Sequence, residues 1–370
     1  MRELHTTQFG VLAVKSQKNR EVIPKMTISE FRDILNVNNA HMIIDDPFAF
    51  TLKYGGIEVM YQLYQSNSDI QLAIARQYLY TQRMYYHCNT LFDDLDHINY
   101  AIIKGAVLSQ RIYSNPAIRK SSDIDILISR NQLDYVKSVL EKHGFQQSKV
   151  RNGKLVPYTR RELVYHSVFT HQTASFRKLT SDPLCPIINV DINTDIFWGE
   201  SSHKADMIDF LRHTEKTEIF GIKAKRLTTI YDFISLCLHH YKDLNSLYLL
   251  WQRGISLSKF CDIYYYLSNI QIEPQQLRYI CNQLNVAEYV YYCIYQTTVI
   301  FDSNFTVYLN ALYSRQAESL LKRIGLSKNH YKYMHKCIAS YIFDDNFHSD
   351  LEQMLTKDDL LQIKANESFF

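Results

Sequence analysis

The segment Asp123-Ile-Asp-Ile-Leu-Ile128 decides how the chain is interpreted, because acidic and branched apolar residues alternate along it. Alternation with a period of two is typical of a β-strand with one apolar face. Side chains at i and i+2 share a face, so Asp123 and Asp125 are expected together, opposite the isoleucines. The two carboxylates repel each other unless a divalent cation lies between them, and Mg²⁺ prefers carboxylate oxygens as ligands. The segment therefore predicts a strand that carries a magnesium site.

A second short strand is expected just upstream, at Tyr100-Ala-Ile-Ile-Lys104, where Gly105 ends the apolar run and a helix follows. Glycine lets the backbone approach a phosphate closely, and the N-terminal N–H groups of a helix attract an anion. Lys104 adds a positive charge to this junction. Arg119, whose guanidinium can hold a phosphate through two parallel hydrogen bonds, and Ser122 lie between the two strands. These residues are the candidate contacts of a phosphate chain.

A third acidic side chain is expected on a strand at Ile187-Ile-Asn-Val-Asp-Ile-Asn193. Asp191 alternates there with apolar residues, so it belongs to the polar face of that strand. A third carboxylate beside the first pair would complete a cage for two metal ions about 3.5–4 Å apart. Asp195 is the alternative, but it lies past the end of the predicted strand, so Asp191 is preferred.

Composition favours helices in the rest of the chain. Only 10 glycines and 7 prolines occur in 370 residues. So few turn-forming residues in a long chain argue against many short strands. We expect an α+β fold with a small mixed sheet within residues 98–205. An N-terminal helical segment, 1–97, and a C-terminal helical domain, 206–370, flank this core in the sequence.

Local patterns predict the individual elements. Thr27 and Glu30 have the spacing of a capping box, and apolar residues recur at helical spacing over residues 69–96, as one helix or two. Residues 131–143 are a predicted helix with Asn131 as N-cap and Gly144 as C-cap. A further strand is expected at residues 163–170. The helices predicted in the C-terminal part are 228–241, 258–267, 274–284, 288–299, 304–325 and 329–342.

The sequence lacks the patterns of a secreted or membrane-spanning protein. Its N-terminal residues contain no apolar core of a signal peptide, and no stretch reaches the ~18 consecutive apolar residues of a membrane span. The seven cysteines are scattered, which predicts reduced thiols and a cytoplasmic location. The formal net charge of +3 gives no basic coat, so general nucleic-acid binding is not expected.

The block around the acidic residues resembles the polymerase-β-like nucleotidyltransferases and, more closely, a bacterial family of uncharacterised nucleotidyltransferases. That family has Lys-Gly after the first strand, a helix end with Tyr and Pro, an Arg, and Asp-hydrophobic-Asp-hydrophobic-Leu. The matching residues here are Lys104-Gly105, Tyr113 with Pro116, Arg119 and Asp123-Ile-Asp-Ile-Leu127. A helix that ends at His240 and the segment Asp262-Ile-Tyr match later motifs, so the similarity covers about residues 75–265.

The resemblance implies an enzyme of the EC 2.7.7 type. It would move a nucleoside monophosphate from an NTP, expected to be ATP, to a small molecule, peptide or protein, with release of pyrophosphate. The ligands that it implies for two Mg²⁺ ions are Asp123, Asp125 and Asp191. The triphosphate contacts that it implies are Lys104, Gly105, Arg119 and Ser122.

Two other functions stay open at this point. A catalytically inactive nucleotide-binding or interaction protein could keep the same fold, and a toxin-like transferase could use RNA as its acceptor. Mg²⁺-dependent binding of ATP or GTP, followed by release of pyrophosphate, would separate an enzyme from an inactive protein.

Overall fold

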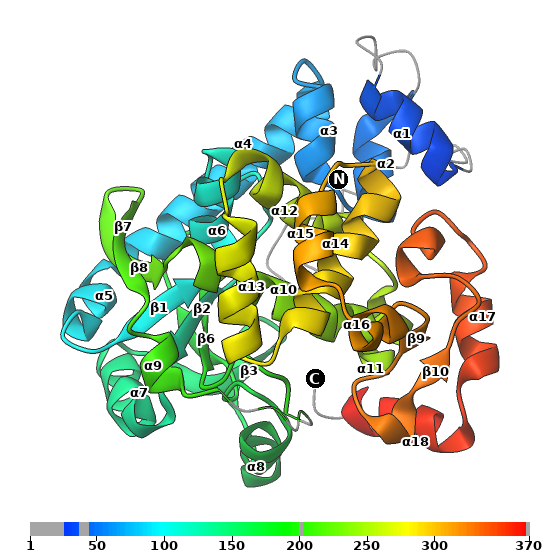
Figure 1. Ribbon diagram of the computed structural model, residues 1–370. Coiled ribbons are helices and arrows are strands. Elements are labelled where there is room, and N and C mark those ends of the chain that lie inside the picture. Colours follow the sequence, from blue (N-terminus) through cyan, green and yellow to red (C-terminus); the bar gives the residue numbers. More distant parts are fainter. Residues whose placement is uncertain (1–25, 37–43, 200, 202, 204, 368–370) are drawn as a thin grey trace. The chain divides into compact units, whose positions relative to one another are not determined.

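The computed structural model describes residues 26–36, 44–199, 201, 203 and 205–367 (Figure 1). The described residues fall into two compact units. The sheet unit comprises 72–195 and 206–228, and the helical unit comprises 26–71, 196–205 and the residues from 229 onward. The three-part division at 97/98 and 205/206 stays a prediction, because compactness does not show which segments fold on their own.

The sheet unit is built on an eight-stranded mixed sheet with the strand order β4-β3-β5-β6-β2-β1-β8-β7. The expected α+β class with a mixed sheet is therefore confirmed, although the sheet is larger than the sequence suggested. Its strands are β1 (Tyr100–Ile103), β2 (Ile124–Ile128), β3 (Gln146–Arg151), β4 (Lys154–Pro157), β5 (Phe176–Leu179), β6 (Ile187–Asn193), β7 (Thr214–Ile219) and β8 (Ile222–Leu227). The pairs β1/β8 and β2/β6 are parallel, and the other neighbours are antiparallel.

Helices cover one face of the central strands. The helices of this part are α4 (Ser68–Tyr86), α5 (Asn89–Leu95), α6 (Gly105–Tyr113), α7 (Leu133–Lys142), α8 (Arg160–Phe169) and α9 (Met207–Phe210). Ile126 of β2 and Val190 of β6 are buried in one core with Tyr85 of α4, Phe92 of α5 and Leu140 of α7. The isoleucine face of β2 thus lies against helices, as the alternation predicted, and the aspartates belong to the opposite face.

Several local predictions are confirmed. The predicted helical region 69–96 forms two helices, α4 and α5. Thr27 and Glu30 form the capping box, because the Thr27 N–H donates to Glu30 Oε2 at 2.6 Å and the Glu30 N–H donates to Thr27 Oγ1 at 3.2 Å. Gly144 has a φ of 81°, which is the left-handed conformation expected after the end of α7.

Two predictions near the sheet were wrong. Residues 163–170 were predicted to be a strand, but most of them belong to helix α8. A capping box starts this helix: Thr159 Oγ1 accepts from the Glu162 N–H, and Glu162 Oε2 accepts from the Thr159 N–H at 2.8 Å. Asn131 is not an N-cap either, since it lies in the 3₁₀ turn Arg130–Gln132 and α7 begins at Leu133.

The hairpin formed by β7 and β8 was also missed, since residues from 206 onward were predicted to be helical. Phe220 and Gly221 connect the two strands and have φ values of 52° and 80°. Two consecutive positive φ values are typical of the two-residue turn whose twist matches a β-hairpin. The hairpin joins the sheet through the parallel pairing of β8 with β1.

The helical unit is organised around α14, which packs against α1, α10, α12, α13, α15 and α16. Its helices are α1 (Ile28–Asn36), α2 (Pro47–Tyr54), α3 (Ile57–Leu63), α10 (Thr229–Asn245), α11 (Leu247–Arg253), α12 (Leu257–Asn269), α13 (Pro274–Gln283), α14 (Ala287–Phe301), α15 (Thr306–Leu312), α16 (Arg315–Leu320), α17 (Phe347–Met354) and α18 (Lys357–Glu367). The predicted helices up to residue 299 are confirmed with small shifts of their ends.

The last two predicted helices were wrong. The region 304–325 contains α15 and α16, because Ser314 caps a new helix by accepting from the Ala317 N–H at 3.0 Å. Strand β9 (Arg323–Ile324) follows and pairs with β10 (Lys332–Tyr333). The region 329–342 holds β10 and the 3₁₀ turns Lys328–His330 and Ile338–Tyr341 in place of an α-helix.

Two further observations concern the helices and the cysteines of the described residues. None of the helices in the described ranges is both long and apolar enough to cross a membrane. All seven cysteines have free thiols, and six of them are buried, in line with their expected role as small core residues.

Candidate active site

The acidic residues meet on one face of two neighbouring strands. Strands β2 and β6 run parallel in a register that places Asp125 directly opposite Asp191. Asp123 lies just before β2, two residues from Asp125, so it shares that face. The prediction that the third acidic strand lies beside the first is confirmed. The register puts Asp191 opposite Asp125, whereas Asp195 lies beyond the end of β6.

The acidic charges in this cluster are incompletely balanced. Burial, with the charges of Asp125 and Asp191, raises the pKa of Asp123 to about 7, although Lys104 and Arg119 oppose the shift. Burial and the charge of Asp125 raise the pKa of Asp191 to about 6. Carboxylates shift in this direction where they share a site with like charges and little water. The cluster therefore favours either protons or additional cations.

Asp125 has two polar partners. Lys104 Nζ lies 3.2 Å from Asp125 Oδ1, and both side chains are only about a tenth exposed. The antiparallel pairing of β1 with β2 puts Ile103 opposite Asp125, so Lys104 follows directly at the end of β1. Asn193 Nδ2 donates to the same oxygen at 3.1 Å. Asn193 was not predicted as a site residue, although its place two residues after Asp191 on the same strand indicated it.

Two buried oxygens of β6 lack a donor. Among the residues that the structure describes, neither Asp191 Oδ1 nor Asn193 Oδ1 has a hydrogen-bond partner. The Asn193 amide cannot simply be reversed, because the Asp125 carboxylate accepts hydrogen bonds and so requires the Nδ2 group. Buried acceptors without donors are costly. A cation at this face would give both oxygens a partner. These residues therefore fit the hard, oxygen-rich site that Mg²⁺ prefers.

The cluster is not a closed metal cage by itself. In the described ranges, no group of three or more His, Cys, Asp or Glu side chains is arranged to hold a metal ion. The Lys104 ammonium instead lies against Asp125. Mg²⁺ usually keeps several ligands from water and substrate phosphates and takes one or two carboxylates from the protein. A partial set of carboxylates is consistent with that mode of binding.

The junction of β1 and α6 has the backbone geometry expected of a phosphate site. Lys104 and Gly105 have φ values of 60° and 51°. A Cβ on Gly105 would lie 2.9 Å from Ser121 Oγ, so the position also lets the loop before β2 pack closely. The side chain of Lys104, the residue before α6, makes no capping hydrogen bond to this helix. The first N–H groups of α6 are therefore candidate contacts of an anion.

Arg119 and Ser122 lie in the loop that leads to Asp123. The Arg119 N–H donates to Ser109 Oγ at 3.0 Å, which ties this loop to α6. The positive charge of Arg119 acts on Asp123, since it opposes the rise of that pKa. The backbone carbonyl of Ser122 accepts from Tyr80 of α4. All seven predicted site residues therefore lie on β2 and β6, at the junction of β1 with α6, or in the loop before β2.

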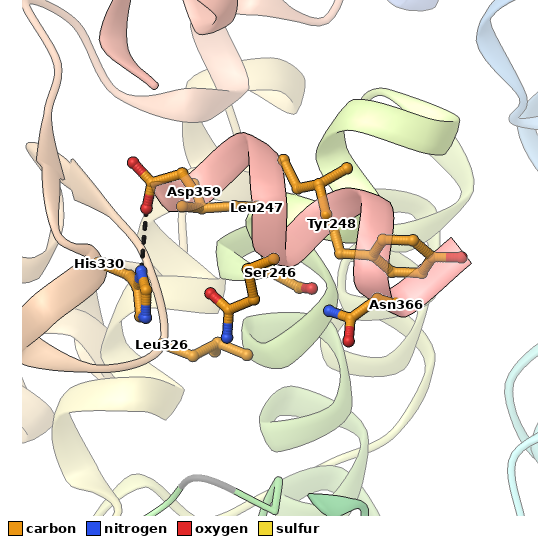
Figure 2. A pocket seen from close by; sticks show the side chains of 9 residues that line it. Ser246, Leu247, Tyr248, Leu326, His330, Asp359 and Asn366 are labelled. Carbon is orange, nitrogen blue, oxygen red and sulfur yellow. Dashed lines mark hydrogen bonds and ion pairs between the residues drawn. The ribbon is translucent and has the colours of Figure 1, made fainter. Parts of the chain in front are cut away.

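The helical unit contains a pocket of a different kind, lined in part by Ser246, Tyr248 and Asn366 (Figure 2). Asp359 lies on one side of it and accepts a hydrogen bond from His330 Nδ1 at 2.9 Å. None of the predicted site residues lines this pocket.

Two of the later sequence motifs meet inside the helical unit. His240 of α10 and Asp262 of α12 form a pair in which Nε2 and Oδ2 are 3.0 Å apart. Both side chains are 2% exposed, so the pair joins two helices in a buried core. The sequence marked each residue separately, but their pairing depends on the packing of α10 against α12.

Comparison with families of known proteins identifies the family of this chain. No curated protein and no solved structure shows significant similarity to this chain. The model of a family described as "uncharacterised nucleotidyltransferase" matches residues 65–302, which is well over half of the chain. This range contains Lys104, Gly105, all three aspartates of the site and the His240–Asp262 pair. The chain therefore belongs to that nucleotidyltransferase family.

Proposed function

We propose that this protein is a Mg²⁺-dependent enzyme that transfers a nucleoside monophosphate from an NTP, with ATP as the expected donor, to an acceptor and releases pyrophosphate. The observation that carries the proposal is the register of β2 and β6, which puts Asp125 opposite Asp191 on the face that Asp123 shares. Family membership supports nucleotidyl transfer in general.

The three aspartates are the proposed ligands of Mg²⁺. Bound there with the NTP, the metal would neutralise charge on the phosphates and orient them for in-line displacement. Two observations support this assignment. Asp191 Oδ1 has no partner among the described residues, and burial together with neighbouring carboxylates raises the pKa values of Asp123 and Asp191. The protons held by the acids at low pH would leave as the metal binds.

Lys104 has two alternative anionic partners in this proposal. Without substrate, its ammonium group neutralises Asp125 at 3.2 Å. With substrate, we expect it to turn to the β- or γ-phosphate, since Asp125 then has the metal as its partner. The N-terminus of α6 and the Arg119 guanidinium are the other proposed contacts of the phosphates. Charge on the leaving pyrophosphate grows during the reaction, so these cations stabilise its departure.

Asp191 also offers a place for the proton of the acceptor. Its carboxylate has two oxygens, so we expect one to hold the metal and the other to accept a hydrogen bond from an entering hydroxyl or amine. The identity of the acceptor is not part of the proposal.

The test uses the full chain with each of the four NTPs, labelled at the α-phosphate, in the presence of Mg²⁺ and a cell extract as a source of acceptors. We expect pyrophosphate release and transfer of label to a non-nucleotide fraction, and loss of both in Asp125→Asn. Binding of Mg²⁺·NTP without transfer would support an inactive nucleotide-binding protein. Label that moves only to RNA would support the toxin-like alternative, and no nucleotide binding would refute the proposal.

A further inference from the structure

The backbone around Asp123 is held by side chains from α4, from β6 and from the loop itself. Gln77 Nε2 of α4 donates to the Ser121 carbonyl at 2.7 Å, and the Tyr80 hydroxyl of α4 donates to the Ser122 carbonyl at 3.3 Å. Asn189 Nδ2 of β6 donates to the same Ser122 carbonyl at 3.1 Å. Ser121 Oγ donates to the Asp123 carbonyl at 2.9 Å. The orientation of Asp123 therefore depends on these donors.

Asn189 differs from the other donors because its own orientation is fixed. Arg177 Nε of β5 donates to Asn189 Oδ1 at 2.9 Å. A guanidinium can only donate, so the Asn189 amide must turn its oxygen toward Arg177 and its Nδ2 toward Ser122. Strand register supports this geometry, because Arg177 is directly opposite Asn189. Asn189 thus connects a fixed cation to the loop that carries Asp123.

Arg177 is anchored on its far side. Its Nη1 donates to the Ser148 carbonyl of β3 and to the Tyr158 hydroxyl, the latter at 3.1 Å. The guanidinium is therefore held by the β3–β4 hairpin, and its charge also opposes the rise in the pKa of Asp191. A continuous set of hydrogen bonds runs from this hairpin through Arg177 and Asn189 to the backbone beside Asp123.

We propose that Asn189 is a positioning residue for the metal site, acting through the Ser122 carbonyl on Asp123. This inference rests on the proposed function, because it takes Asp123 as a metal ligand. Asn189 itself needs no contact with metal or nucleotide. Groups that orient metal ligands usually change metal affinity about 10–100-fold when they are removed. The inference therefore predicts a change in the Mg²⁺ requirement, with a much smaller change in the KM for NTP.

The experiment compares Asn189→Ala and Asn189→Asp with wild type. N189D is nearly isosteric and still accepts from Arg177, but it cannot donate to the Ser122 carbonyl. We expect both variants to raise the Mg²⁺ concentration for half-maximal turnover at least about tenfold. Mn²⁺ binding in the presence of ATP, followed by electron paramagnetic resonance, should weaken by a similar factor.

Gln147→Ala is the matched control. Gln147 Nε2 of β3 also donates to a backbone carbonyl in this sheet unit, that of Ala174, at 3.0 Å, but it does not contact the loop before Asp123. We expect Q147A to keep the metal requirement of wild type while losing a similar hydrogen bond.

The outcomes separate the two proposals. Wild-type protein that binds no Mn²⁺ with ATP would refute the proposed function and this inference with it. If wild type is active and both Asn189 variants need the same Mg²⁺ concentration as wild type, the positioning role alone is overturned. N189D that matches wild type while N189A is impaired would also overturn it, because the contact with Arg177 would then be the important one.

Discussion

Aspartates with shifted pKa values occur in both units, but their surroundings differ. In the sheet unit, Asp123, Asp125 and Asp191 share one strand face, and burial with mutual repulsion raises the pKa of Asp123 and Asp191. In the helical unit, Asp243 has His239, Lys242 and Lys259 within ion-pair distance. Burial alone would raise the pKa of Asp243, but these three positive charges hold it well below its usual range.

Asp359 resembles Asp243 in this respect. Its carboxylate oxygens lie 2.9 Å from His330 Nδ1 and 2.6 Å from Lys332 Nζ, and the side chain is 2% exposed. Hydrogen bonds from Thr356 complete its shell. A carboxylate that is already satisfied by protein cations contributes to stability and has little capacity for a ligand. The difference indicates that a shortage of cations, more than burial of acids, distinguishes the candidate active site.

The largest effect is expected when the aspartates of the candidate active site are replaced. Asp123→Asn, Asp125→Asn and Asp191→Asn should each lower the rate of transfer by at least about a thousandfold, because metal ions contribute several kcal/mol to such transition states. Metal-free Asp123→Asn and Asp191→Asn should unfold at temperatures equal to or above that of wild type, since one repelling charge is removed. Asp125→Asn should unfold at a lower temperature, because Lys104 loses its partner. Full activity of Asp123→Asn and Asp125→Asn with Mg²⁺ would show that the site is assigned wrongly.

The second prediction tests Asp243, whose charge is balanced by neighbouring cations. Asp243→Asn should destabilise the protein by about 3 kcal/mol, because it leaves three cations around a neutral amide. Urea unfolding measures this loss, and transfer activity of the folded variant should stay near that of wild type. The comparison fails if Asp243→Asn is as stable as wild type while Asp123→Asn is strongly destabilised.

The third prediction concerns the cations of the candidate site. Arg119→Ala should weaken binding of Mg²⁺·NTP about 30-fold, which corresponds to about 2 kcal/mol for a charged hydrogen-bonding group. Arg119→Lys should recover only part of this, because an ammonium lacks the planar fork of a guanidinium. Calorimetric titration measures the affinity. Wild-type affinity and wild-type pyrophosphate release in Arg119→Ala would remove this residue from the site, and the same result in Lys104→Ala would remove Lys104.

The smallest expected effect is the pH dependence of metal-free stability. The pKa of Asp123 is about 7 in the folded chain and near 4 when unfolded, so the folded state binds the extra proton between these values. Stability from this site is therefore present at low pH and is lost as the pH rises from about 4 to about 7. Asp123→Asn and wild type should therefore be about equally stable at pH 3, and the variant should be more stable by about 1 kcal/mol or more at pH 8.

The contribution of Asp243 to stability should depend on pH in the opposite direction. Its pKa is lowered on folding, so its stabilising contribution is present above pH 4 and is lost as the solution is made more acidic. Thermal unfolding between pH 3 and pH 8, without metal, measures both sites. A gain for Asp123→Asn that is independent of pH would contradict the interpretation of the acid-rich cluster.

The sequence by itself determined the chemistry of the candidate site. The alternation at residues 123–128 predicted a strand with its isoleucines in the core, and the similar alternation at residues 187–193 predicted the partner strand. Both predictions succeeded because the two-residue period of a strand is a local property that the order of residues records directly. The Lys104-Gly105 junction was also recognisable locally, because Gly105 ends the apolar run of the first strand.

Only the tertiary structure decided which residues act together. The register that puts Asp125 opposite Asp191, the contacts of Asn193 and Asn189, and the pairing of His240 with Asp262 all join residues far apart in the chain. The error at α8 is of another kind, because the capping box of Thr159 and Glu162 that starts this helix is a local signal that the strand prediction overlooked. Register and pairing instead depend on hydrogen bonds and packing across elements, and the sequence of one segment does not contain the partner that it will meet.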